Sequence, residues 1–166
     1  STVLQNTNRH EEAIANLEKV LSIAGAQPAV LIPLATSLFL SERREEARSL
    51  LEEALQNLSD SDEDLLVWAG RVVLQMGKDK EGRQALNRAI ELNDRNASAH
   101  IDLARHYSIN NITVLNAIEH FQSGLSLGVS DPRITVELVD CLSRIGEYDK
   151  ARKILYDLVH DTGNFS

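Results

Sequence analysis

Small and apolar residues recur along the chain in a pattern that repeats about every 34 residues. The pattern starts at a small residue each time, and the five starting positions are separated by 34, 35, 35 and 34 residues: Ala13, Ala47, Gly82, Ala117 and Ala151. Further apolar or small residues follow at offsets of 4, 7 and 8, which together define one face of a helix. This periodicity predicts five helices, over about 9–24, 43–58, 79–92, 114–127 and 147–161.

A second stripe, with spacings of 3, 1 and 3 residues, precedes each of the last four helices. The stripes begin at Leu31, Leu66, His100 and Thr135. They predict four more helices, over about 30–41, 63–76, 97–109 and 132–145. Residues suited to tight turns separate paired helices: Gly77, Asn110–Asn111 and Gly146. We therefore expect an all-α chain without strands, built from helix-turn-helix units.

The helix-turn-helix unit resembles the tetratricopeptide repeat. Gly77 and the run Gly146-Glu147-Tyr148 match the turn between the two helices in this family. The match is degenerate, because the family's tryptophan position holds other residues in every repeat. The resemblance implies a right-handed α-solenoid of about four and a half repeats. It also implies a scaffold or adaptor that binds proteins.

The whole chain is expected to form a single array of repeats. We expect a partial repeat and four further repeats, over 1–27, 28–62, 63–96, 97–131 and 132–166. Residues 1–6 are expected to be a remnant of a lost first helix. Pro33 is expected in the first turn of a helix that starts near Leu31, because proline is tolerated there and costly deeper in a helix. Since neither end shows a polar capping repeat, we expect a piece of a longer array.

The net charge of −8 disfavours two classes of partner. Nucleic-acid binders need a basic face, and anionic membranes repel an acidic chain. No apolar run approaches the ~20 residues that cross a bilayer, so membrane insertion is not expected. The single cysteine, Cys141, cannot form an internal disulfide. A cytoplasmic location is the default, and the periplasm and the secretory pathway stay open.

Two short motifs suggest catalytic or metal chemistry and are better explained by helix structure. The run Gly124–Gly128 matches G-x-S-x-G, but a nucleophile elbow needs a strand before its serine, and a helix is predicted here. The acidic run from Asp60 to Asp64 starts like a calcium loop, but lacks that loop's glycine and final glutamate. We expect small-residue packing in the first case and helix capping in the second.

The sequence predicts no enzyme, no cofactor and no metal. None of the five histidines stands four residues from another, as zinc motifs on helices often require. His100 occupies a packing position and is expected to be half-buried. The function is then protein or peptide binding in the concave groove that the first helices line. The alternative is a recruiting region of a larger enzyme or assembly machine whose active site lies outside this chain.

Two arginines mark the candidate groove. The first helix of each helix-turn-helix unit is here called a first helix. Arg71 and Arg105 occupy the same repeat position on two successive first helices, beside apolar residues. Guanidinium groups grip carboxylates bidentately, so an acidic and hydrophobic segment is the expected partner. The candidate groove residues are Val67, Arg71, Leu74, Ile101, Arg105, Val136 and Asp140. In a second interpretation, both arginines pair with acids such as Asp102 or Asp140, or face water.

The first and last helices carry apolar residues without a neighbouring repeat. These residues are Leu4, Val20 and Leu21 at one end, and Leu155, Leu158 and Val159 at the other. Exposed apolar patches tend to find partners, so we expect end-to-end association between copies. Light scattering that stays monomeric at millimolar protein would count against it. The Lys and Asn set of the best-known tetratricopeptide clamp is missing from the groove positions, so chaperone tails are not expected as partners.

Overall fold

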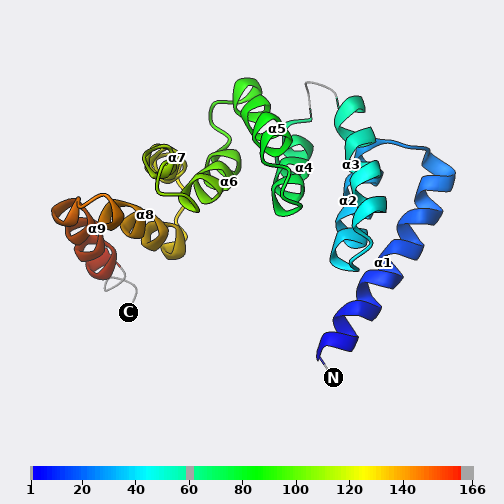
Figure 1. Cartoon of the computed structure of the whole chain (residues 1–166), viewed down its shortest axis with the longest axis horizontal. Helices are drawn as coiled ribbons and strands as arrows, with labels where there is room; N and C mark the ends of the chain where they lie inside the picture. Colours follow the sequence, from blue (N-terminus) through cyan, green and yellow to red (C-terminus); the bar gives the residue numbers. More distant parts are fainter. Residues whose placement is uncertain (1, 59–61, 162–166) are drawn as a thin grey trace. The chain divides into compact units, whose positions relative to one another are not determined.

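The computed structural model describes residues 2–58 and 62–161, and this part of the chain is all-α (Figure 1). It contains nine helices and no strand: α1 (Thr2–Ala24), α2 (Pro28–Leu40), α3 (Arg44–Asn57), α4 (Glu63–Gln75), α5 (Asp79–Leu92), α6 (Ala97–Ser108), α7 (Val114–Ser126), α8 (Pro132–Arg144) and α9 (Tyr148–Asp161). From α2 onward, the helix limits agree with those predicted from the apolar stripes to within about two residues, the usual uncertainty of helix ends. No helix among the described residues is long and apolar enough to cross a membrane.

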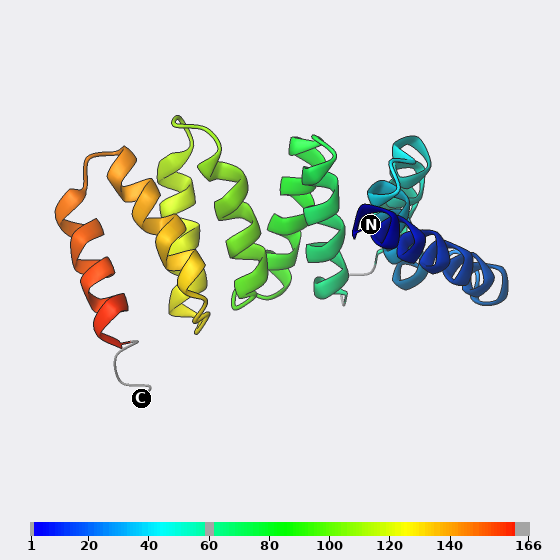
Figure 2. The ribbon, with the colours of Figure 1, turned by 90° about the horizontal axis from the view of Figure 1, so that it is seen from below.

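The chain divides into two compact units. Unit 1 spans Ser1–Leu92 and holds α1 to α5, whereas unit 2 spans Asn93–Ser166 and holds α6 to α9. Within each unit the helices pack in consecutive pairs, α2 with α3 and α4 with α5 in unit 1, and α6 with α7 and α8 with α9 in unit 2. Figure 2 shows that the two helices of the α4–α5, α6–α7 and α8–α9 pairs run in opposite directions. Each pair is the predicted helix-turn-helix unit.

Three of the turns between paired helices share one geometry. Gly77 and Gly146 have φ angles of 76° and 82°, in the left-handed region that glycine adopts without strain. The N–H of the next residue, Lys78 or Glu147, donates to the carbonyl five residues earlier, which is the Schellman arrangement. The α2–α3 turn has the same bond, but Glu42 holds the left-handed position with a φ of 63°.

The α6–α7 turn is longer and uses side chains instead. The Asn110 side-chain oxygen accepts from the backbone N–H of Ile112 at 2.9 Å. The Thr113 hydroxyl donates to the carbonyl of Tyr107 at 2.7 Å. These bonds satisfy backbone groups that a helix end leaves without partners.

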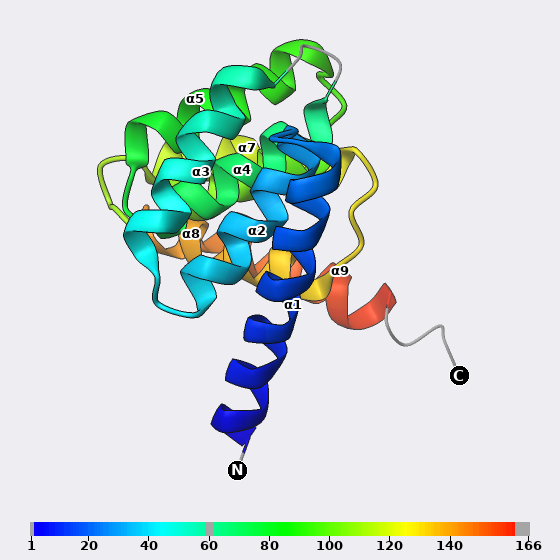
Figure 3. The ribbon, with the colours of Figure 1, turned by 90° about the vertical axis from the view of Figure 1, so that its right-hand side faces the viewer.

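Two predictions about the first repeats are wrong. Residues 2–6 belong to α1, which continues to Ala24 as one helix of 23 residues (Figure 3). No glycine or proline interrupts this stretch, so nothing separates a remnant from the helix that follows. The helix α2 begins at Pro28, not near Leu31, and Pro33 lies inside it. Pro28 has the φ angle that a first helical residue needs, and this starts the helix early.

The core of unit 1 lies between its paired helices. Leu31, Leu51, Leu66 and Leu86 are each at most 1% exposed. The helices α4 and α5 approach closely where Gly70 faces Gly82, since a Cβ on either would lie within 3.1 Å of the other's carbonyl oxygen. Small residues at the start of the sequence pattern therefore permit close helix packing.

The core of unit 2 is centred on Phe121 of α7, which is fully buried. Ile134, Leu138 and Cys141 of α8 belong to the same cluster. The pKa of the Cys141 thiol is raised, chiefly by burial, which keeps it protonated. Cys141 is therefore a small core residue, as the sequence suggested.

The aromatic side chains are divided between the units. The single tryptophan, Trp68, lies on α4 of unit 1 and is 37% exposed. All three tyrosines belong to unit 2: Tyr107, Tyr148 and Tyr156.

Candidate partner-binding surface

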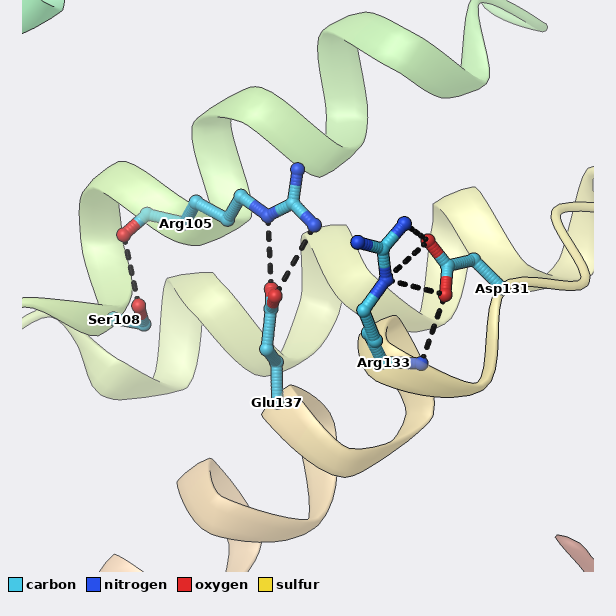
Figure 4. Close-up of polar contacts among 5 residues, drawn as sticks. All are labelled: Arg105, Ser108, Asp131, Arg133 and Glu137. Carbon is cyan, nitrogen blue, oxygen red and sulfur yellow. Dashed lines mark hydrogen bonds and ion pairs between the residues drawn. The ribbon is translucent and has the colours of Figure 1, made fainter. Parts of the chain in front are cut away.

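Arg105 and Glu137 join the two first helices of unit 2. Arg105 of α6 donates from Nε to Glu137 Oε2 at 2.9 Å, and from Nη2 to Oε1 at 3.1 Å (Figure 4). The two side chains are 47% and 37% exposed, so solvent reaches both. The hydrogen bonds to Glu137 raise the pKa of Arg105. This two-bond pair fixes the guanidinium on the surface that α6 and α8 share.

A second arginine–carboxylate pair lies next to the first. Asp131 caps the N-terminus of α8 by accepting the backbone N–H of Arg133 at 3.0 Å. The guanidinium of Arg133 also donates to both carboxylate oxygens of Asp131 (Figure 4). These hydrogen bonds from Arg133 lower the pKa of the Asp131 carboxyl. The side chain of Arg133 is 84% exposed and is available to a partner.

Arg144 holds the end of α8 to the α6–α7 turn. Its Nη1 donates to the carbonyl of Ser108 at 2.5 Å, and its Nε donates to the Asn111 side-chain oxygen at 3.0 Å. Its guanidinium also lies 3.8 Å from the carboxylate of Asp140. The candidate groove residue Asp140 therefore neighbours a structural arginine, and its side chain is 70% exposed.

The predicted groove residues fall into two groups. Val67 and Ile101 are buried at 5% exposure, and Ile101 packs where a Cβ on Gly124 would lie 2.4 Å from its Cδ1. Leu74 is half-buried against Gly82 in the same way. Ile101 and Leu74 therefore fill the space between paired helices, and Val67 is buried.

The other four candidates are exposed. Arg105, Val136 and Asp140 lie on α6 and α8 of unit 2, and Val136 is 51% exposed. Arg71 is exposed on α4 of unit 1. Sequence reasoning did not single out Glu137, which is the partner of Arg105. The sequence carries no direct signal for this pair, because its members are 32 residues apart.

Of the two motifs that suggested chemistry, the run Gly124–Gly128 has a structural role, whereas the predicted capping bond is absent at Asp62 in the acidic run. A helix precedes Ser126, and its hydroxyl donates to the carbonyl of Ser123, so no nucleophile elbow is formed. Gly124 is the buried contact of Ile101 described above. At the start of α4, residues 59–61 lie outside the described part of the chain. Asp62 occupies the N-cap without a side-chain capping bond, and Glu63 and Asp64 follow in the first turn. The acidic first turn favours the helix dipole.

A histidine pair joins α6 to α7. The Nδ1 atoms of His100 and His120 lie 2.9 Å apart, and the ring of Tyr107 stacks on His120 with centroids 5.7 Å apart. His100 is half-buried, as predicted. The sequence does not show the pair, since 20 residues separate its members. No group of three or more metal-ligating side chains occurs among residues whose placement is described.

Acid should destabilise the folded chain through the histidine pair. Burial first, and the neighbouring His100 second, lower the pKa of His120, whereas Glu119 acts in the opposite direction. Below about pH 6.5 the unfolded chain therefore binds more protons than the folded chain. The contribution of neutral His120 to the stability of the fold is complete above about pH 6.5. It is lost as the pH falls through the pKa of His120 in the folded chain. We expect the Tm to decrease more steeply with acid in the native chain than in His120→Gln. Equal slopes would contradict this.

The fold and this surface define a class of protein. Paired helices repeated in tandem, with exposed polar side chains on the first helices, are typical of α-helical repeat proteins of the solenoid type. Residues 7–66 match the family model described as tetratricopeptide repeat, so this region is a tetratricopeptide-repeat region. The resemblance inferred from the sequence is confirmed. Comparison with curated protein sequences gives no match.

Solved structures with the same fold support this class. A crystal structure of MamA is similar with a TM-score of 0.78 and 19% identity, over 96% of this chain and 92% of MamA. Pseudomonas aeruginosa PilF is similar with a TM-score of 0.78 and 24% identity, over 96% of this chain and 71% of PilF. A human IFIT1 dimer with m7Gppp-AAAA is similar with a TM-score of 0.74 and 18% identity, and the match covers 88% of this chain but 35% of IFIT1. At these identities the likeness shows the fold alone.

Proposed function

We propose that the chain is a non-catalytic interaction module that binds an acidic and hydrophobic protein segment along its first helices. The exposed Arg105–Glu137 pair, together with the exposed Val136 that precedes Glu137 on α8, is the observation that supports this most directly. Tetratricopeptide repeats are generally protein-interaction modules, which agrees with the proposal.

The Arg105–Glu137 pair suits exchange with a partner carboxylate. An exposed ion pair contributes only about 0–1 kcal/mol, so breaking it costs little. A carboxylate from the partner can replace or join Glu137 on the guanidinium, while an apolar side chain covers Val136. Arg71 holds the same repeat position on α4, and we propose that it binds a partner carboxylate within unit 1.

The net charge of −8 supports a protein partner over a nucleic acid for this chain. A protein that binds nucleic acid gains most of its non-specific affinity from cations that neutralise phosphates. The exposed apolar side chains at the ends, Val20 at 43% and Val159 at 64%, support the end-to-end association that the sequence suggested. The side chain of Leu4 lies outside the described ones.

A double charge reversal tests the proposed function. Partner proteins captured by the immobilised chain are identified, and their binding segments are purified for affinity measurements. Arg71→Glu/Arg105→Glu should weaken the binding of these segments about tenfold or more, because attraction between guanidinium and carboxylate becomes repulsion between carboxylates.

The matched control reverses charges away from the first-helix positions. Arg9→Glu/Lys19→Glu changes the net charge equally on α1 and should leave the affinity unchanged. Circular dichroism must show equal helix content in both variants. Equal affinity of the native chain and Arg71→Glu/Arg105→Glu would contradict the proposal and move the contacts to another face.

A further inference from the structure

The junction between α3 and the α4–α5 pair of unit 1 contains three adjoining hollows. The first, of about 140 Å³, and the second, of about 40 Å³, are both lined by Arg48, Met76 and Lys78. The third, of about 310 Å³, shares Leu55 and Glu81 with the second. Shared lining residues make the three hollows one continuous depression, here called the α3–α5 groove.

One end of the α3–α5 groove is cationic. Arg44, Arg48 and Lys78 line the first hollow, against one carboxylate, that of Glu45. Arg48 Nε donates to Glu52 at 3.0 Å, so this cation already has a partner. Within the described ranges, neither Arg44 nor Lys78 forms an ion pair with a carboxylate. Two cations at this end are therefore available to an incoming acid.

Aromatic packing holds one of these cations in place. The guanidinium carbon of Arg44 lies 5.9 Å from the centroid of the Phe39 ring, within the range of a cation–π contact. Phe39 lines the same hollow and is half-buried. A guanidinium that rests on a ring loses less side-chain freedom when it binds a carboxylate.

The middle of the α3–α5 groove is mainly apolar. Beside the carboxylates of Glu52 and Glu81, the second hollow is lined by four apolar side chains: Leu51, Leu55, Val73 and Met76. Leu55 and Met76 are half-buried, so part of each side chain is open to a ligand. An apolar side chain placed there would remove apolar surface from water, which favours binding.

We propose that the α3–α5 groove binds a protein segment that carries an acidic side chain a few residues from an apolar one. The carboxylate sits between Arg44 and Lys78, and the apolar side chain covers Leu55 and Met76. Charge complementarity identifies this occupant, because the available cations lie on an otherwise acidic chain. The groove lies in unit 1 and is lined by none of the proposed partner contacts Arg71, Arg105 and Val136, so it is a different surface and does not depend on the proposed function.

Met76 provides a direct readout, because it is the only methionine in the chain. A library of random octapeptides is selected on the intact chain, and enriched peptides are titrated against protein labelled at the methionine methyl group. We expect enriched peptides to combine Asp or Glu with Leu, Ile, Met or Phe, and to shift the single methyl resonance in a saturable way. Serine in place of the apolar residue should abolish the shift.

Charge reversal separates this groove from other surfaces. Arg44→Glu/Lys78→Glu should weaken the binding of the selected peptides about tenfold or more. Arg9→Glu/Lys19→Glu has the same net charge and lines none of the hollows, so its affinity should equal that of the native chain. Arg105→Glu should also bind normally, since it lies in unit 2. Fluorescence of Trp68 confirms that unit 1 is folded in each variant.

Four outcomes would overturn the proposal. The library yields no enriched peptide, or it enriches basic peptides. Alternatively, acidic peptides bind without moving the Met76 resonance, or bind Arg44→Glu/Lys78→Glu as tightly as the native chain. Loss of binding in Arg105→Glu alone would instead assign the peptides to the first-helix surface.

Discussion

Replacing Phe121 by alanine should lower the free energy of unfolding by about 3–5 kcal/mol, the cost typical of aromatic truncation in a packed interior. The ring is fully buried, and Ile134 and Leu138 of α8 lie in the same cluster. It therefore fills the junction between successive repeats of unit 2, and its loss leaves a cavity that surrounding helices close only partly.

Urea denaturation followed by circular dichroism measures this cost. Phe121→Leu is the matched control, because Leu51 and Leu86 occupy the same repeat position and are also buried. It should cost clearly less than Phe121→Ala, since most of the apolar volume stays. A denaturation midpoint of Phe121→Ala equal to that of the native chain would show that the repeat alignment is wrong at this position.

Adding one methyl group at Gly82 should destabilise unit 1 by about 1–3 kcal/mol, the usual cost of overpacking. The new Cβ would lie 2.6 Å from Cγ of Leu74 and 2.9 Å from the carbonyl oxygen of Gly70. Backbone cannot move aside as a side-chain end can, so α4 and α5 must separate. This cost has to exceed the gain of about 1 kcal/mol in helix propensity on replacing glycine by alanine.

Gly124→Ala is the comparison for Gly82→Ala. Its Cβ would meet the Cδ1 of Ile101 at 2.4 Å, while the nearest backbone atom is 3.5 Å away. The end of an isoleucine side chain can rotate, so Gly124→Ala should cost less. Thermal unfolding of both variants under identical conditions gives the comparison. A Gly82→Ala variant more stable than the native chain would show that the α4–α5 pair tolerates separation.

The fold was predictable because one physical requirement recurs in every repeat. A small residue such as Ala47 or Ala117 must sit where helices approach closely, and larger apolar residues must follow on the same face. Ala47 and Ala117 are buried in the structure, as are Leu51, Leu86 and Phe121, which follow four residues after the small residue of their repeats. The helix limits followed from the same stripes, and Gly77 and Gly146 marked their turns.

Local exceptions were not predictable from the pattern. The α2–α3 turn places Glu42 in the left-handed region, although its sequence contains no glycine. Tertiary packing of the paired helices fixes that turn against the local preference. The position of Pro33 inside α2 has a local cause, since Pro28 starts the helix before the apolar stripe begins.

The candidate surface was predictable only in part. A helical stripe shows which residues share a face, but it does not separate the edge of that face from its buried centre. Val67 and Ile101 were assigned to the groove and are buried. The pairing of Arg105 with Glu137 joins residues that are 32 positions apart, which a single sequence does not reveal.

The division of aromatic residues between the units gives each unit its own optical signal. Trp68 reports on unit 1, while Tyr107, Tyr148 and Tyr156 report on unit 2. Tryptophan emission and tyrosine emission can therefore be followed in a single denaturant titration without any label. Coincident transitions would mean that the units unfold as one cooperative block, and separate transitions would give each unit its own stability.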